Sequence, residues 1–312
     1  MDSKWRVLDF TAYEGFLSYE RGRIVAGERS TPLAEVDFIL LGMGCSWGYG
    51  LVAGLERFDV AAAICDWRNQ PISTLYHWSE NTKVFTRHEA QAELSVPRAK
   101  NAWMQIVKAK LRGQANCLDA MGRPGAADIR ALARSVRSGD PSNAEAQGAR
   151  LYWGAFLPER GFRRQQLSDD MVNGMLNYGY TILRGRVLTR VIAAGLCPTL
   201  SLFHRHRSNA FALVDDLMEP FRPAVDYAVY QLISAGSTEL GRQEKAALVQ
   251  VLSDAVNADS PFKLRTVMED FCSEFALYVE GKRDRLSVPV WELTAVEELR
   301  EDGRSCVADG DV

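Results

Sequence analysis

Short apolar runs separated by turn-forming residues mark the first 90 or so positions of the chain. Such runs predict β-strands, which we expect at residues 7–10, 16–19, 24–26, 38–41 and 60–65. The polar residues 20–23 predict a hairpin turn between the second and third of these strands. A short helix is expected over residues 47–58, although its glycines lower the helix propensity.

From about residue 95 the apolar positions recur at helical spacing instead. The longest such pattern covers residues 171–194, where Gly195 suits the end of a helix and Pro198 lies just beyond it. The polar and basic residues 158–166 predict a loop. Further helices are expected around residues 99–111, within 122–139, and over 143–153, 210–218, 224–233, 243–256 and 264–279.

The change of period predicts an α+β fold with two domains. A small β-rich domain covers residues 1–92, and a larger all-α domain covers residues 93–293. Residues 294–312 form an acidic tail that we expect to be disordered.

Composition places few limits on this picture. The chain has 312 residues, 47% hydrophobic and 25% charged, which is typical of soluble globular proteins. Its net charge of -3 argues mildly against a nucleic-acid binder, although local clustering of basic residues matters more. The six cysteines form no CxxC pair, which disfavours a zinc site or a dense disulfide scaffold. No leader-like or membrane-spanning pattern is visible, so we expect a cytoplasmic protein.

A candidate metal site lies after the longest helical pattern. His204 and His206 occupy a short loop there, and Asp216 and Glu219 follow at a spacing that places both carboxylates on one side of a helix. Two acids near a helix end repel each other unless a cation lies between them. A third ligand, Glu145, is available on a predicted helix of otherwise small residues. The alternatives are a solvated basic loop, an exposed acidic helix end and an ordinary surface glutamate.

Several separated motifs resemble one known family. They are Asn173, the run from Leu176 to Tyr180, the run from Ala193 to Leu196, His204, and the run from Asp216 to Pro223. Together they look like the CRISPR-associated integrases that acquire new spacers. The run from Ser142 to Gln147, followed by Tyr152 and Trp153, is most similar to members from type II systems, which accompany Cas9. The resemblance spans roughly residues 5–291 and is strongest over 141–226.

The resemblance implies a catalytic and metal-binding triad of Glu145, His204 and Glu219, with Asp216 as a supporting acid and His206 outside the motif. It implies Mg²⁺ or Mn²⁺ as the cofactor and a DNA transesterification as the reaction. A pre-spacer 3′-hydroxyl would attack a phosphodiester at the leader–repeat junction. It also implies a homodimer formed through the β-rich domain, double-stranded DNA as substrate, and a small companion integration subunit as partner, with Cas9 as a further candidate.

Arginines cluster around the triad segments and are candidates for phosphate contacts, because pre-spacers vary in sequence. We expect DNA contacts from Arg163, Arg164, Arg184, Arg186, Arg205 and Arg207, with Arg160 and Arg190 as further members of the cluster. Two other interpretations stay open. One is a related transposon-borne integrase outside CRISPR, and the other is a DNA-binding scaffold without catalysis.

Overall fold

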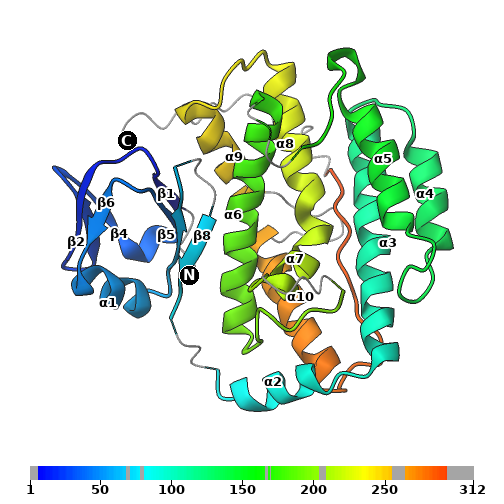
Figure 1. Cartoon of the computed structure of the whole chain (residues 1–312), viewed down its shortest axis with the longest axis horizontal. Helices are drawn as coiled ribbons and strands as arrows, with labels where there is room; N and C mark the ends of the chain where they lie inside the picture. Colours follow the sequence, from blue (N-terminus) through cyan, green and yellow to red (C-terminus); the bar gives the residue numbers. More distant parts are fainter. Residues whose placement is uncertain are drawn as a thin grey trace, which may run out of the picture.

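The computed structural model describes residues 6–67, 71–77, 81–165, 168, 170–203, 209–254 and 264–293, with the side chains of 251–254 left aside. Strands and one short helix form the N-terminal part, and a group of helices forms the rest (Figure 1). The predicted α+β class is confirmed.

The described N-terminal residues form two four-stranded sheets. One sheet has the order β1 (Arg6–Phe10), β5 (Val36–Leu41), β7 (Ala61–Cys65) and β8 (Pro71–Leu75). The other has the order β4 (Arg29–Pro32), β3 (Arg23–Ala26), β2 (Gly15–Glu20) and β6 (Cys45–Trp47). A 3₁₀ turn, η1 (Leu33–Glu35), precedes β5, and α1 (Tyr49–Arg57) precedes β7. The five predicted strands, the hairpin and the short helix are all confirmed. Sequence patterns missed β4, β6 and β8, because these strands are short or partly polar.

Strand β5 is buried on both faces and separates two hydrophobic cores. Alternate side chains of a strand point to opposite faces, so Phe38 and Leu40 join the core of the helices while Ile39 and Leu41 join the N-terminal core. The ring of Phe38 lies so close to Gly185 that an added Cβ there would come within 2.2 Å of it. Close packing at this glycine joins the first sheet to the helices.

The helical part contains α2 (Val84–Ala92), α3 (Val96–Ala120), α4 (Ala126–Ser135), α5 (Ala144–Phe156), η2 (Pro158–Arg160), α6 (Met171–Ala193), α7 (Ala212–Met218), η3 (Glu219–Phe221), α8 (Arg222–Ser234), α9 (Arg242–Asp254) and α10 (Leu264–Val279). The predicted helices are confirmed, and Gly195 follows α6 with a φ of 64°, as a helix-ending glycine does. Helix α3 is longer than expected, and α2 was missed.

Helix α2 already belongs to the helical part by its contacts. Arg87 forms an ion pair with Glu280, at 2.6 Å between Nε and Oε1, and donates to the carbonyl of Ala194. The change from strands to helices therefore falls between Leu75 and Val84. A division at residue 92 stays a prediction.

Helix α6 packs against β5 and β7 of the first sheet and against α7, α8, α9 and α10 (Figure 1), and it is buried along most of its length. Across its contact with the sheet, Arg186 and Arg190 pair with Asp37 of β5, at 2.7 and 3.0 Å. In the described part of the chain, no helix is both long and apolar enough to cross a membrane. The cysteines among the described residues are free thiols. The predicted disordered tail lies outside the described residues.

Candidate active site

Glu145 lies in the first turn of α5, and a neighbouring carboxylate fixes the start of that helix. The two oxygens of Asp140 accept hydrogen bonds from the backbone amides of Ala144 and Glu145, at 2.8 and 3.0 Å. These amides have no partner inside the helix, so a side-chain acceptor stabilises its first turn. Asp140 is buried, which holds the position of Glu145 firmly.

Helix α5 approaches α3 closely at Gly148, one turn after Glu145. A Cβ added to Gly148 would lie 2.1 Å from the side chain of Leu111. Only a glycine permits this approach without moving one helix, and the approach brings Glu145 within reach of a short ion pair with α3.

Glu219 begins the 3₁₀ turn η3 directly after α7. Its side chain is 6% exposed, and its Oε1 accepts from Nε of Arg222 at 2.9 Å. Burial would lower the pKa of Arg222, but Glu219, together with Tyr180, Asp215 and Asp226, outweighs it and raises that pKa. The Glu219 carboxylate is therefore buried in the helical part and held by a guanidinium.

Lys110 of α3 lies between the two glutamates. Its Nζ is 2.6 Å from Oε1 of Glu145 and 2.6 Å from Oε2 of Glu219. Burial would lower the pKa of Lys110, but Glu219 and Glu145 outweigh it and raise the pKa above its usual value. Two carboxylates from separate helices thus converge on a single buried ammonium group.

The same donor set suits a hard divalent cation, because Mg²⁺ and Mn²⁺ favour carboxylate oxygens. The ammonium of Lys110 shows that the two carboxylates can share one cation. Among the described residues, no group of three histidine, cysteine or acidic side chains has metal-binding geometry. The predicted third ligand, His204, lies outside the described residues, as do Arg205, His206 and Arg207.

The segment that leads to His204 is held from two sides. One oxygen of Asp216, fully buried, accepts from the backbone amides of Leu202 and Phe203, at 2.7 and 3.0 Å. The ring of Phe203 stacks on Trp103, with 4.6 Å between centroids. Trp103 precedes Lys110 by two turns of α3, so both lie on one side of that helix. Asp216 therefore acts on the backbone before His204, and α3 supports both halves of the candidate site.

A second buried acid, Asp226 of α8, has tyrosines rather than an ion pair as its nearest partners. Tyr152 donates to its Oδ2 at 3.0 Å, and Tyr180 donates to its Oδ1. Burial raises the pKa of Asp226 to about 6, although both tyrosines and Arg222 act to lower it. Tyr180 is therefore part of the interior.

The chain matches the family model of the CRISPR associated protein Cas1 over residues 11–256. The chain belongs to the Cas1 family. It is 32% identical to a CRISPR-associated endonuclease Cas1 of Neisseria meningitidis over 277 residues, which cover 86% of this chain and 90% of that protein. A CRISPR-associated endonuclease Cas1 of Pyrobaculum aerophilum is 32% identical over 230 residues, covering 69% and 77% of the two chains. The predicted family resemblance is confirmed.

Solved structures show the same fold. A casposase bound to its integration product aligns with a TM-score of 0.75 at 21% identity, covering 91% of this chain and 92% of that one. A Cas1 protein from Thermotoga maritima aligns with a TM-score of 0.74 at 14% identity, covering 90% and 99%. A Cas6-RT-Cas1–Cas2 complex contains a chain that aligns with a TM-score of 0.72 at 15% identity, covering 94% and 36%.

The arginines predicted to contact DNA differ in their surroundings in this Cas1 family member. Arg163 is exposed. Arg164 is half-buried and donates to the side chains of Asn173 and Asn177, at 2.8 and 2.7 Å. Arg184 is half-buried and pairs with Asp215 at 2.7 Å.

The prediction for Arg186 is corrected by the structure. Its side chain is 1% exposed and pairs with Asp37, so it joins the sheet to α6 and presents nothing to a phosphate. Arg190, 7% exposed and paired with the same acid, is excluded for the same reason.

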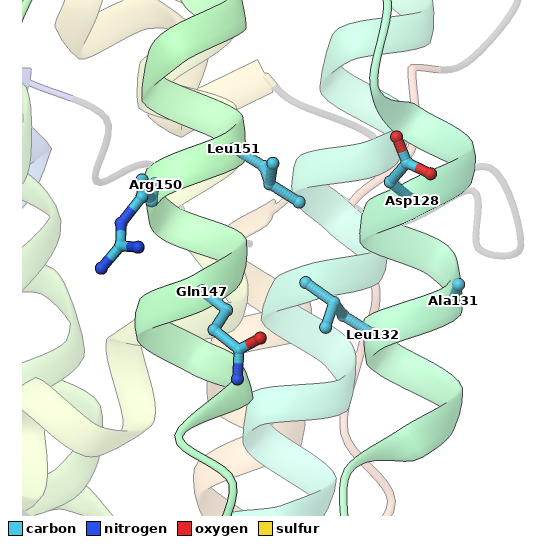
Figure 2. Close-up of a pocket in the computed structure, with 6 residues that line it drawn as sticks. All are labelled: Asp128, Ala131, Leu132, Gln147, Arg150 and Leu151. Carbon is cyan, nitrogen blue, oxygen red and sulfur yellow. The ribbon is translucent and has the colours of Figure 1, made fainter.

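A pocket of about 490 Å³ lies between α4 and α5. Figure 2 shows Leu132 and Leu151 directed into it, whereas Arg150 extends away from it on the other side of α5. It lies on a side of α5 that carries Gln147 and Leu151, whereas Glu145 and Gly148 face α3. The pocket contains none of the candidate catalytic residues, and the convergence of acids on Lys110 defines the site instead.

Sequence reasoning missed three residues that build the site: Lys110, Asp140 and Trp103. Asp140 had a detectable pattern, because an acid followed by proline, serine and asparagine before a helix is typical of a helix start. Lys110 and Trp103 sit in an ordinary amphipathic pattern, which carries no information about what their helix will face.

Proposed function

We propose that this chain is a metal-dependent DNA endonuclease and integrase that joins pre-spacer DNA to a CRISPR array. The observation that carries the proposal is the convergence of Glu145 and Glu219 on one cation position. The naming of curated relatives as CRISPR-associated endonucleases supports the activity. The fold shared with a casposase bound to its integration product supports the strand-joining reaction.

The proposed reaction is a transesterification. The 3′-oxygen of a pre-spacer end forms a new bond to phosphorus at the leader–repeat junction, losing its proton. The bond from that phosphorus to the 3′-oxygen of the neighbouring nucleotide breaks, and this oxygen leaves with a proton as a new 3′-hydroxyl. The divalent ion, when bound, lowers the pKa of the attacking hydroxyl and neutralises phosphate charge.

Residues of this chain divide the remaining tasks. Glu145 and Glu219, together with His204, would hold the divalent ion. Asp216 would hold the backbone before His204, because its carboxylate already binds the amides of Leu202 and Phe203. Arg222 orients Glu219 through its ion pair.

The DNA backbone would be held by arginines outside the interior. Arg163, Arg184, Arg205 and Arg207 are the proposed phosphate contacts, with Arg164 joining them once it exchanges its asparagine partners. Phosphate contacts position DNA without reading its sequence, which suits pre-spacers of variable sequence.

The proposed partners are double-stranded DNA, a second copy of the chain bound through the β-rich part, and a small companion integration subunit. Neighbouring structures include a Cas1 protein with DNA and a complex that contains Cas2, which supports the first and third of these. Cas9 stays a proposal from the resemblance to type II members. A transposon-type integrase is the second candidate, favoured by the likeness to the casposase.

A branched half-site substrate tests the proposal in the presence of Mn²⁺. We expect Glu145→Gln, Glu219→Gln and His204→Ala each to raise the activation barrier by several kcal/mol. Strand transfer would then be about a thousandfold slower. Asp128→Asn, an exposed acid of α4, is the control and should keep full activity. Full activity of all three site variants would refute the site, and a loss on His206→Ala in place of His204→Ala would identify the other histidine. Preference for leader–repeat DNA over transposon ends separates the two candidate functions.

A further inference from the structure

We infer that Lys110 is a tethered counter-cation of the site: its ammonium holds the position between Glu145 and Glu219, and a divalent ion must displace it to bind. The inference rests on the proposed function, because it concerns how the proposed metal site is regulated. It predicts that the free protein binds divalent ions weakly and that Lys110 is the cause.

The contacts of Lys110 support this role. Its Nζ lies 2.6 Å from both carboxylates, and its side chain is 11% exposed. Removing the ammonium that both acids share is strongly unfavourable, because it leaves their charges less well compensated in a largely buried site. The ammonium thus allows α5 and η3 to bring their acids together before any metal arrives.

The charges at the site explain why the ammonium of Lys110 must leave its position between the two glutamates. Glu145 and Glu219 carry two negative charges, and Lys110 and Arg222 carry two positive ones. A divalent ion added to this balanced set would leave two positive charges in excess at close range. Like charges this close to one another repel even in water, and they repel more strongly in a protein interior.

Of the two cations, Lys110 is the one that can withdraw. The guanidinium of Arg222 is held by Glu219 and lies over the ring of Tyr180, 4.6 Å from its centroid. Lysine carries a point charge on a flexible four-carbon stem, whereas the planar arginine fork is held by its partners. The displaced ammonium would then be free to neutralise a phosphate of bound DNA. Metal and DNA would therefore strengthen each other's binding, which is a reciprocal coupling.

The test is Mn²⁺ affinity of the full-length protein without DNA, measured by electron paramagnetic resonance. Lys110→Met keeps the length of the side chain and removes the charge. We expect it to bind Mn²⁺ more tightly than the wild type by about tenfold or more, since one positive charge beside the ion is gone. Its melting temperature without metal should fall, and added Mn²⁺ should raise it more than in the wild type. Lys108→Met, two residues away on the same helix and lining a different groove, should change neither quantity.

Lys110→Arg keeps the charge in a form that binds carboxylates more firmly, so it should bind Mn²⁺ no better than the wild type. This variant keeps the test decisive if Lys110→Met does not fold without metal, because tighter Mn²⁺ binding by Lys110→Arg would overturn the inference. Equal or weaker Mn²⁺ binding by a folded Lys110→Met would overturn it as well.

Glu219→Gln separates this inference from the proposed function. If the wild type binds Mn²⁺, Glu219→Gln abolishes that binding and Lys110→Met does not tighten it, the metal site stands and the counter-cation role is refuted. If neither the wild type nor any variant binds Mn²⁺, with or without DNA, the proposed metal site fails, and the role of Lys110 fails with it.

Discussion

Two ion clusters in this protein are built from similar contacts, but one centres on a single acid and the other on a single lysine. Between the first sheet and α6, one acid, Asp37, is paired with two arginines, Arg186 and Arg190, at 2.7 and 3.0 Å. Between α3, α5 and η3, two acids share one lysine at 2.6 Å. Burial would raise the pKa of Asp37, but Arg190, Arg186 and Arg265 together outweigh it and lower the pKa.

The Asp37 cluster is therefore structural, whereas the cation in the Lys110 cluster can be replaced. Arginine guanidinium groups hold a carboxylate in fixed geometry and stay charged, so we expect the ion pairs of Asp37 to stay formed. A single lysine between two acids has the charge and position of a stand-in for a metal ion. The comparison predicts that disrupting the first cluster affects folding and disrupting the second affects chemistry.

Arg186→Met should have the largest effect on stability. Asp37 would lose its ion pair with Arg186, and removing one partner of a buried ion pair typically costs about 3–5 kcal/mol. Urea unfolding followed by circular dichroism measures the free energy of unfolding, with Arg163→Met, an exposed arginine, as the control. The folded fraction of Arg186→Met should bind Mn²⁺ as the wild type does. A loss under about 1 kcal/mol would show that the cluster does not hold the sheet to α6.

Asp226→Asn tests a buried acid whose nearest partners are tyrosines. The folded pKa of Asp226 is raised to about 6, above the value of 3.8 expected when it is unfolded. Its stabilising contribution is therefore fully present below the unfolded pKa and is lost as the pH rises through 6. Two pKa units correspond to about 3 kcal/mol.

Unfolding experiments from about pH 4 to pH 7 should therefore show wild-type stability falling relative to Asp226→Asn, which keeps the size and removes the charge. Asp37→Asn provides a control, because the lowered pKa of Asp37 stabilises the protein above the unfolded value of 3.8 and loses that effect only as the pH falls below it. The stability curves of wild type and Asp37→Asn should therefore run nearly parallel over this pH range. Parallel stability curves for wild type and Asp226→Asn would contradict the raised pKa.

Much of the fold was predictable because local patterns determine it. The predicted helix over 264–279 matches α10, and the pattern over 171–194 matches α6 to within one residue. The strands that were missed are short or partly polar, and their pairing depends on neighbours distant in sequence. Hydrophobic periodicity and turn-forming residues carry no information about such strand pairing.

The acids of the site could be predicted from the sequence, but the cation that neutralises them could not. Glu145 and Glu219 were identified from motifs, yet nothing in the pattern of α3 shows that Lys110 joins them. Arg186 was misjudged for a related reason: arginines near a catalytic segment suggest DNA, and only the tertiary contact with Asp37 shows otherwise. Partners from distant segments decide the role of a charged residue.

Asp216→Asn should have the smallest effect and tests whether this acid is a positioning residue or a metal ligand. Its Oδ2 accepts from the amides of Leu202 and Phe203, so the substitution weakens two charge-assisted hydrogen bonds and loosens the backbone before His204. Strand transfer should fall about tenfold, as is typical when the support of a metal ligand is disturbed. Mn²⁺ should still bind at one site, since Glu145 and Glu219 are unchanged, whereas Glu219→Gln should abolish binding. Loss of Mn²⁺ binding by Asp216→Asn to the same extent as by Glu219→Gln would make Asp216 a ligand. The comparison of clusters would then have to include a third acid in the replaceable one.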